Sequence, residues 1–503
     1  MSSPKMEQKN IDMAFVTKWG LIFALIGNVV GAGNIWRFPR MAALNGGGAF
    51  VLAWTICLLV FSIPLMQCEH IMGRSTRQAP PGAFRDFAGK KFAWFGMFLT
   101  CCGFGIGCYY AVICGWSIRY LLGAITGDIF VNSELVWENF VSTPGLQVLF
   151  QFISMAIAWY FLYRGVSKGI EFISKIMIPM LFFMLVAMAI YSITLPNSIL
   201  GLKYLFEIQP EYLLKSSTWL QALSQSAWSV GPGWGLTLAY AAYIKQREEP
   251  SFLPVIQGFG DNSAALLAGV TIIIIVFSFS SSVAVANETM AAGNVGLAFV
   301  ALPKLFSTIP GGRIVGIMFF TAFLFGAITS LMAMMEVLIC TLCKWGWQRK
   351  KAVCFTCGLG FIIGLPSAIS IKFLNNQDWV FGVALLFGCL FTALAMTKFG
   401  TKKARERFIN TSFSHLKFGV WWDFCIKFVV PIFFLGVFIW WIAQSISWYP
   451  DTWWHPFAES SAGTIIFQIS ILVAVLLIFN NKIAEAVKHK YFNGEDYPPI
   501  PKE

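Results

Sequence analysis

Residues 27–34 read Gly-Asn-Val-Val-Gly-Ala-Gly-Asn and interrupt the first long apolar run of the chain. A second interruption, Ser-Val-Gly-Pro-Gly-Trp-Gly at residues 229–235, lies inside the sixth such run. Because glycine and proline weaken helices, both runs are predicted to be discontinuous helices. The two breaks lie five runs apart, which is typical of transporters built from inverted repeats around a site at the middle of the bilayer.

Close helix packing is the alternative explanation of the breaks, because small residues let membrane helices approach one another. Three polar residues nevertheless accompany the breaks, namely Asn28, Asn34 and Ser229. Polar side chains inside a bilayer need partners and usually mark functional sites. The polar residues therefore favour a binding site.

The composition indicates that the chain is surrounded by lipid. Of the 503 residues, 57% are hydrophobic and 12% are charged, a balance that excludes a water-soluble globular domain. A spanning helix needs about 20 mainly apolar residues. We predict an all-α membrane protein with twelve transmembrane helices, at residues 19–44, 47–71, 93–124, 146–163, 169–195, 216–244, 257–285, 313–345, 352–371, 378–398, 426–449 and 461–482.

The net charge of +12 reflects membrane topology rather than binding of nucleic acid. Lysine and arginine cluster after the second and tenth runs, at residues 74–91 and 398–407, whereas the connection between the third and fourth runs carries only acidic charges. Basic loops stay in the cytoplasm. Since the number of spans is even, both termini are expected in the cytoplasm, in a multi-pass protein of the cell membrane.

Metal binding and catalysis are not indicated. Cys340, Cys343, Cys354 and Cys357 have zinc-like C-x2-C spacing, but both pairs lie at apolar helix ends, where thiols pack as small hydrophobes. The four histidines are scattered, and the sequence contains neither H-E-x-x-H nor G-x-S-x-G. We therefore expect no catalytic residues.

Several strings of the sequence resemble the neurotransmitter:sodium symporter family. The first comprises residues 27–39 and Asn45-Gly46-Gly47-Gly48-Ala49-Phe50, and the second comprises Ile63-Pro64-Leu65, Glu69 and Met72-Gly73-Arg74. Further similarity lies at residues 109–110, 240–243 and 327–330, and at Asp378, which is expected to open the tenth helix. The resemblance covers spans one to ten.

The resemblance implies the fold of the family's bacterial leucine transporter. Spans one to five and six to ten then form inverted repeats, at approximately residues 19–195 and 216–398, within a transporter core of residues 19–398. Spans eleven and twelve, within residues 399–482, are expected at the periphery. Residues 1–18 and 483–503 are expected to form cytoplasmic ends.

By similarity, the first break binds an amino acid carboxylate through backbone N–H groups near Ala32 and Gly33. Monoamine carriers of the family have an acidic residue at the position of Gly31, so here the substrate must supply its own carboxylate. The largely apolar pocket predicts a neutral amino acid, hydrophobic or aromatic. The expected substrate-binding residues are Val29, Gly31, Ala32, Gly33, Ile106, Tyr110, Trp228, Ser229, Gly231, Trp234 and Met334.

The resemblance also implies one or two sodium ions, bound by oxygen sets that suit a hard cation. The ligands of the first ion are the substrate carboxylate and Val29, Asn34, Ser229 and Asp261. Those of the second are carbonyls of Gly27, Val30 and Gly326 and hydroxyls of Thr329 and Ser330. Alternatively, the two hydroxyls bond back to their own helix.

Chloride is not expected as a cofactor. Animal members of the family have Asn and a chloride-ligating Ser at the positions of Asp261 and Ala265. Asp261 lies one helical turn from Ala265 and supplies the negative charge that chloride provides in those members. Two alternatives remain for Asp261, a protonated carboxyl or a cap of a helix broken at residues 260–263.

The family resemblance further implies two gates. Arg37 and Asp378 are expected to pair above the substrate, with Trp228 as an aromatic lid. Asp12 and Lys344 are expected to close the opposite side, with the polarity reversed relative to the family; two unrelated surface charges are the alternative.

The sequence thus predicts a sodium-coupled symporter that imports a neutral amino acid by alternating access. A non-transporting amino acid sensor and a cation-independent exchanger of the same fold are the alternatives, and the Thr329–Ser330 pair favours sodium coupling. The expected partners are the amino acid and the lipid bilayer, without nucleic acid or an obligate protein partner.

Overall fold

The computed structural model describes residues 14–245 and 248–488. In these ranges the regular secondary structure is helical, apart from one isolated antiparallel bridge between Gly47 and Ile208. Asp12 lies outside the described residues. The predicted all-α fold is confirmed.

Ten helical segments among the described residues are long and apolar enough to cross a membrane. They are Gly48–Thr76 (α4, η2 and α5), Lys90–Thr126 (η3 and α7), Pro144–Tyr163 (α9), Val166–Ile193 (η5 and α10), Leu253–Ser278 (α15), Gly312–Lys344 (α19), Arg349–Ile369 (α20), Ile371–Phe399 (α21), Val420–Trp448 (α23, η8 and α24) and Ala462–Ala486 (α25).

The first and sixth predicted spans are both interrupted in the structure. The first consists of α2 (Lys18–Val29), η1 (Gly33–Arg37) and α3 (Phe38–Leu44), with a bend of 56° at its break. The other consists of α13 (Ser216–Val230) and α14 (Leu236–Ala241). A further apolar pair, Val283–Ala291 (α16) and Gly293–Thr308 (α17, η6 and α18), bends by 115° at its break.

The start of the tenth helix differs from the prediction. The α21 helix begins at Ile371 rather than at residue 378, because the Ser370 side chain accepts a hydrogen bond from the backbone N–H of Phe373 and caps the helix there. Asp378 therefore lies two turns inside α21 and does not open it.

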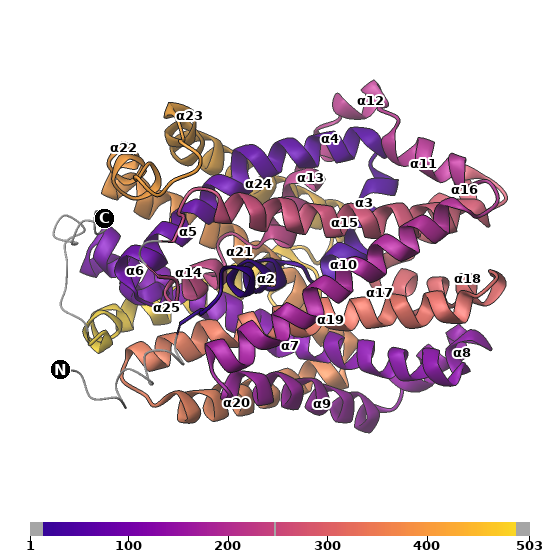
Figure 1. Cartoon of the computed structure of the whole chain (residues 1–503), viewed down its shortest axis with the longest axis horizontal. Helices are drawn as coiled ribbons and strands as arrows, with labels where there is room; N and C mark the ends of the chain where they lie inside the picture. The colour runs from indigo at the N-terminus through magenta and orange to yellow at the C-terminus, as the bar shows by residue number, and fades with distance from the viewer. Residues whose placement is uncertain (1–13, 246–247, 489–503) are drawn as a thin grey trace.

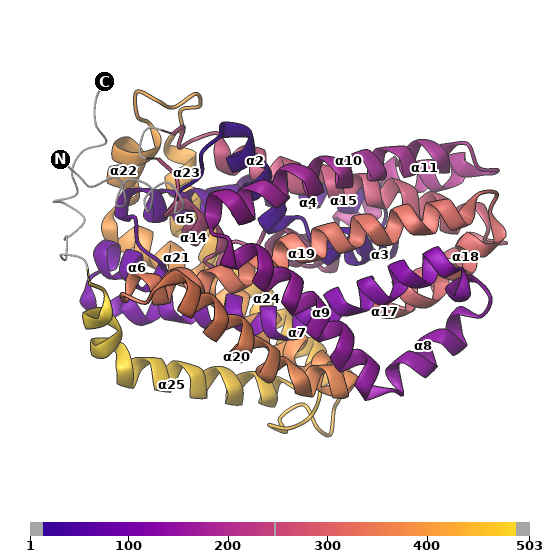
Figure 2. The same ribbon diagram turned by 60° about the horizontal axis from the view of Figure 1, so that its bottom comes forward.

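Short helices that the sequence analysis did not predict cover both ends of the bundle. At one end lie α6 (Pro80–Ala88) and α22 (Thr401–Ala404); at the other lie α8 (Ser133–Val141), α16 and α18 (Figures 1 and 2). We call these the proximal end and the distal end. The α11 (Ser198–Phe206) and α12 (Pro210–Leu213) helices connect α10 to α13.

Helix burial separates the centre of the bundle from its periphery. In the most apolar stretch of Lys90–Thr126, 83% of the residues are buried, against 28% in Val420–Trp448 and in Ala462–Ala486. The α7 helix is therefore central, whereas α24 (Val430–Trp448) and α25 present most of their surface outward.

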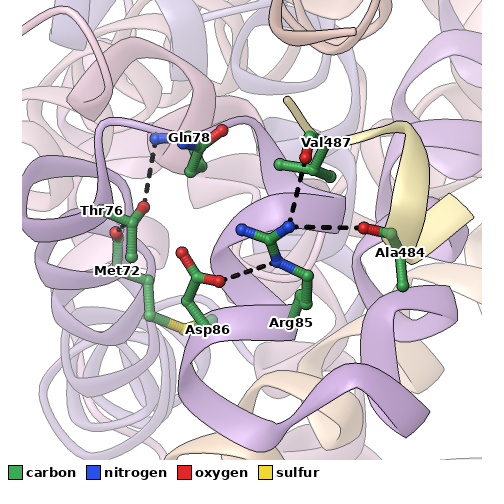
Figure 3. Close-up of polar contacts among 7 residues, drawn as sticks. All are labelled: Met72, Thr76, Gln78, Arg85, Asp86, Ala484 and Val487. Atoms are coloured by element: carbon green, nitrogen blue, oxygen red, sulfur yellow. Dashed lines mark hydrogen bonds and ion pairs between the residues drawn. The ribbon is translucent and has the colours of Figure 1, made fainter. Parts of the chain in front are cut away.

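The last helix is attached to α6 at the proximal end (Figure 3). Arg85 of α6 is buried, and its guanidinium donates hydrogen bonds to the carbonyl oxygens of Ala484 (3.4 Å) and Val487 (3.3 Å) at the end of α25. The final carbonyls of a helix lack partners inside it, so Arg85 satisfies groups that would otherwise be unpaired. Asp86 accepts from Arg85 Nε at 2.8 Å.

The break in the sixth span is built around left-handed glycines and one buried carboxylate. Gly231, Gly233 and Gly235 have φ angles of +68°, +85° and +73°, which favour glycine. Glu69 of α5 (Ile63–Thr76) accepts from the backbone N–H groups of Gly233 (2.7 Å) and Leu238 (3.2 Å). Glu69 therefore caps the start of α14 and stabilises the unwound segment.

Candidate substrate and sodium sites

A cavity of about 790 Å³ reaches from the two helix breaks to the distal end, where Leu44 of α3, Gly293 of α17 and Ile371 of α21 line it. Of the eleven predicted substrate-binding residues, ten line the cavity: Val29, Gly31, Gly33, Ile106, Tyr110, Trp228, Ser229, Gly231, Trp234 and Met334. Ala32 is buried behind this surface, and its backbone N–H donates to Tyr110 Oη at 2.8 Å.

The unwound segment of the first span has no room for a side chain at Gly31. A Cβ atom there would lie 2.9 Å from Tyr110 Oη and 3.0 Å from Ser330 Oγ, closer than ordinary van der Waals contact. An acidic side chain at this position would displace both hydroxyl groups. The base of the cavity therefore combines backbone amides and hydroxyl groups with largely apolar walls.

Asn34, Ser229 and Asp261 form a buried polar cluster beside the breaks. Asn34 Nδ2 lies 2.6 Å from Asp261 Oδ1 and 3.0 Å from Ser229 Oγ, and Ser229 Oγ donates to Asp261 Oδ2 at 2.6 Å. Because α15 is continuous through residues 260–263, Asp261 does not cap a broken helix. The amide Nδ2 is thus the hydrogen-bond donor that faces the Asp261 carboxylate.

The set of oxygen atoms in this cluster suits sodium. A carboxylate, a hydroxyl and an amide oxygen are hard ligands. Asn34 Oδ1 instead accepts from the backbone N–H of Gly31 at 2.8 Å. The amide must therefore turn over before Oδ1 can face a cation beside Asp261.

The five residues predicted for the second ion also lie together. Ser330 Oγ donates to the Val30 carbonyl at 3.1 Å, and a Cβ at Gly326 would lie 3.3 Å from the same oxygen. A Cβ at Gly27 would lie 3.3 Å from Thr329 Cβ. Thr329 Oγ1 donates to the carbonyl of Gly326 at 3.1 Å, so Thr329 bonds within its own helix while Ser330 reaches across to the first span.

Arg37 and Asp378 line the same cavity without forming the expected ion pair. Among the described residues, Arg37 donates to Gln225 Oε1 (2.7 Å) and Ser224 Oγ (3.1 Å) on α13, and Asp378 accepts from Tyr109 Oη at 3.1 Å. Each of the two charged side chains is therefore hydrogen-bonded to a different set of neutral polar side chains. The distal end is therefore open between them.

The proximal end, in contrast, is held by an ion pair between a buried carboxylate and a largely buried guanidinium. Arg349, at the start of α20, donates to both carboxylate oxygens of Glu336 on α19, at 2.7 and 2.8 Å. Tyr243 Oη, just after α14, donates to Glu336 at 2.7 Å, and Arg349 also reaches the Leu162 carbonyl at the end of α9 (3.2 Å). Lys344, the predicted partner of Asp12, ends α19 and is half-buried.

Glu171 forms a second proximal contact. Its carboxylate accepts from the backbone N–H groups of Val16 (2.8 Å) and Thr17 (3.1 Å) before α2, and from Lys175 Nζ at 2.7 Å. A Cβ at Gly20 would lie 2.3 Å from this side chain, so the first turn of α2 lies directly on it. Glu171 and Glu336 were not predicted to be functional residues, although acidic residues inside apolar runs often mark functional sites.

Four residues of α24 line the cavity and were also missed: Trp440, Trp441, Gln444 and Trp448. Their span was predicted to be peripheral. Tryptophans near the end of a membrane helix, such as Trp441 and Trp448, fit an interfacial belt equally well, so the sequence alone does not distinguish the two roles.

Comparison with known proteins identifies the family. A sequence model of the "Sodium:neurotransmitter symporter family" matches residues 13–143 and 130–485. The chain belongs to this family. It is 30% identical over 435 residues to an uncharacterized sodium-dependent transporter of Methanocaldococcus jannaschii, covering 83% of this chain and 88% of the relative.

Further similarities cover nearly the whole length of other family members. An uncharacterized sodium-dependent transporter of Bacillus subtilis is 28% identical, over 86% of this chain and 98% of its own. The crystal structure of MhsT in complex with L-phenylalanine aligns with a TM-score of 0.73 and 29% identity, over 85% of this chain and 99% of that chain. This symporter-family chain therefore has the leucine-transporter-like fold of inverted repeats, is a sodium-dependent multi-pass membrane transporter and is not an enzyme.

Proposed function

We propose that this transporter imports a neutral, hydrophobic or aromatic amino acid together with one or two sodium ions. The observation that carries the proposal is the base of the cavity, where the unwound backbone of the first span lies between the Asn34–Ser229–Asp261 cluster and the Thr329–Ser330 pair. The crystal structure of MhsT contains L-phenylalanine, an amino acid of this class.

The charge of Asp261 supports sodium coupling. The carboxylate of an amino acid bound at Gly31–Gly33 would lie beside Asp261, and two neighbouring carboxylates repel each other in a low-dielectric site. A sodium ion between them converts this repulsion into attraction. Sodium binding and substrate binding then strengthen each other by the same factor.

The side-chain specificity follows from the cavity walls. Ile106, Trp228, Trp234 and Met334 line the base, and a buried apolar wall cannot stabilise a charged side chain. Lysine and glutamate are therefore expected to bind poorly.

The open distal end and the closed proximal end correspond to one of the two states that alternating access requires. We assign the proximal end to the cytoplasm, because α22 lies there, contains Lys402 and Lys403 and is followed by Arg405. The cavity then faces the outside, in the direction of import. The transporter core of residues 19–398, the additional helices of residues 399–482 and the cytoplasmic ends belong to the same proposal.

The test combines binding with transport. Purified protein is screened against the proteinogenic amino acids for thermal stabilisation with and without sodium, and the ligands found are then tested for uptake into proteoliposomes under a sodium gradient. We expect sodium-dependent stabilisation by apolar amino acids and uptake of the same ones. Binding without uptake indicates a sensor, uptake without sodium indicates an exchanger, and preference for lysine or glutamate contradicts the specificity.

We further propose that transport is independent of chloride. Asp261 and Ala265 are both buried, one turn apart on α15, and the Asp261 carboxylate lies directly in the candidate sodium site. Replacing chloride by gluconate on both sides of the proteoliposome membrane should leave sodium-driven uptake unchanged. Loss of uptake in gluconate would contradict this assignment.

A further inference from the structure

Gly382 of α21 lies directly behind the ring of Trp228. A Cβ atom at position 382 would lie 2.8 Å from Trp228 Cζ2, 3.4 Å from Trp228 Cε2 and 3.1 Å from Trp441 Cη2. The first of these distances is about 0.6 Å short of the 3.4 Å at which ordinary van der Waals contact begins. No side chain fits at this position unless an indole ring moves.

The glycine has no evident backbone role. Gly382 lies inside the continuous helix α21, and its backbone is not in the left-handed region. Glycine destabilises a helix interior relative to alanine. A glycine inside a helix is therefore usually explained by a neighbouring group that packs too closely for a side chain. Here the packing partner is the ring of Trp228.

The two indole rings at Gly382 differ in their freedom to move. Trp441 is buried and stacks on Trp379, with ring centroids 5.2 Å apart and planes 9° apart, and Trp379 Nε1 donates to the Ser461 carbonyl at 3.1 Å. Trp228 is only half-buried and lines the cavity. A methyl group at position 382 would therefore push Trp228, rather than Trp441, into the cavity.

We propose that Gly382 is a specificity-determining position that sets the largest substrate side chain the cavity accepts. By leaving room behind Trp228, it allows this ring to withdraw from the base of the cavity. Trp234, whose ring centroid lies 5.6 Å from that of Trp228 at 85°, limits the space on the other side. The inference rests on the proposed amino acid transport and adds that the site is built for a large aromatic side chain.

Competition of L-tryptophan and L-valine for sodium-driven uptake tests the inference. The Gly382→Ala variant is expected to weaken apparent tryptophan affinity about tenfold or more, since one misplaced methylene in an apolar pocket changes discrimination by roughly 10–200-fold. Valine affinity should change less than about threefold. Trp228→Phe in the Gly382→Ala background should restore the tryptophan-to-valine ratio, because phenylalanine lacks the indole atoms that meet the new methyl group.

Gly436→Ala on α24 is the matched control. It is also a glycine-to-alanine change inside a helix, but its Cβ makes only an ordinary contact of 3.8 Å with Leu220 Cδ2. Its tryptophan-to-valine ratio should equal that of the wild type. If Gly382→Ala weakens both substrates equally, or if Trp228→Phe fails to restore the ratio, the inference is wrong.

Wild-type uptake separates this inference from the proposed function. If the wild type takes up no amino acid, the proposed function fails and the inference fails with it. If Gly382→Ala does not fold, the Gly382→Ala/Trp228→Phe double variant is compared with Trp228→Phe alone. Because phenylalanine leaves room for the new methyl group, the double variant should fold and the two proteins should have the same tryptophan-to-valine ratio. A lower ratio in the double variant contradicts the inference.

Discussion

The two ends of the helix bundle are held in different ways. At the distal end, Arg37 and Asp378 face one cavity and bond to separate neighbours. At the proximal end, Glu336, Arg349 and Tyr243 form one buried hydrogen-bonded cluster. Under the proposed alternating access, the proximal contacts would have to break when that end opens, and the distal charges would be free to pair when the cavity closes.

The largest expected effect concerns the buried ion pair. Glu336→Gln leaves Arg349, whose side chain is 12% exposed, without its charged partner, and breaking a buried pair from one side costs up to about 3–5 kcal/mol. We expect a loss of this order in the free energy of unfolding, measured by thermal denaturation in detergent. Cys343, half-buried near the end of α19, should also react faster with an alkylating reagent.

Glu134→Gln is the control for that experiment. Glu134 and Lys304 form an exposed pair at 3.5 Å, with side chains 65% and 69% exposed, and exposed pairs contribute at most about 1 kcal/mol. If both variants lose the same stability, the proximal pair does not hold the bundle closed.

The next effect concerns the charge in the candidate sodium site. Asp261→Asn keeps the shape of the side chain but removes its charge, and we expect the half-saturating sodium concentration to rise about 10–100-fold. Sodium titration of uptake measures this. Glu134→Gln removes an exposed carboxylate of α8 that lies outside the cluster, and it should shift sodium dependence less than about threefold. Equal shifts would exclude Asp261 as a direct ligand.

A smaller effect is expected at Glu171. Glu171→Gln weakens the charge-assisted bonds to Val16 and Thr17 by about 1–2 kcal/mol, a factor of about 5–30 in local opening. Hydrogen exchange of the backbone amides at residues 16–20 measures that opening. Lys175→Gln leaves both bonds in place and should accelerate exchange much less; equal acceleration would show that the carboxylate does not hold the start of α2.

The smallest effect is expected between Arg37 and Asp378 in the open state. A double-mutant cycle of Arg37→Ala and Asp378→Ala should give a coupling energy near zero for the ligand-free protein, since the two side chains form no ion pair. With sodium and substrate bound, coupling of about 1.5 kcal/mol or more is expected if they pair on closure. Thermal stability measured without and with the ligands gives the two coupling energies. Equal coupling energies in the two conditions would contradict the proposal that Arg37 and Asp378 form a gate.

The broken helices were predictable because their signal is local. Glycine, proline and polar residues cluster within a few positions of one another, at 27–34 and 229–235, inside runs that are otherwise apolar. Asp261 was found through the family pattern, and its contact with Asn34 and Ser229 lies where that pattern places it.

The proximal contacts could not be read from the sequence. Residues 162, 243, 336 and 349 lie on four separate elements, and no spacing along the chain relates them. The distance between Arg37 and Asp378 was also unpredictable, because it depends on which end of the bundle is open. Trp441 could not be predicted to line the cavity, because its position depends on how α24 packs against α21.

The orientation of the Asn34 amide bears on the order in which sodium and the amino acid would bind. While Asn34 Oδ1 accepts from the N–H of Gly31, that donor cannot bind a carboxylate. If sodium binds beside Asp261 as proposed, turning the amide over would bring Oδ1 to the ion and would release the N–H of Gly31. Sodium would therefore bind before the amino acid. Without sodium, the N–H of Gly31 would still be bonded to Asn34 Oδ1 and could not bind the substrate carboxylate.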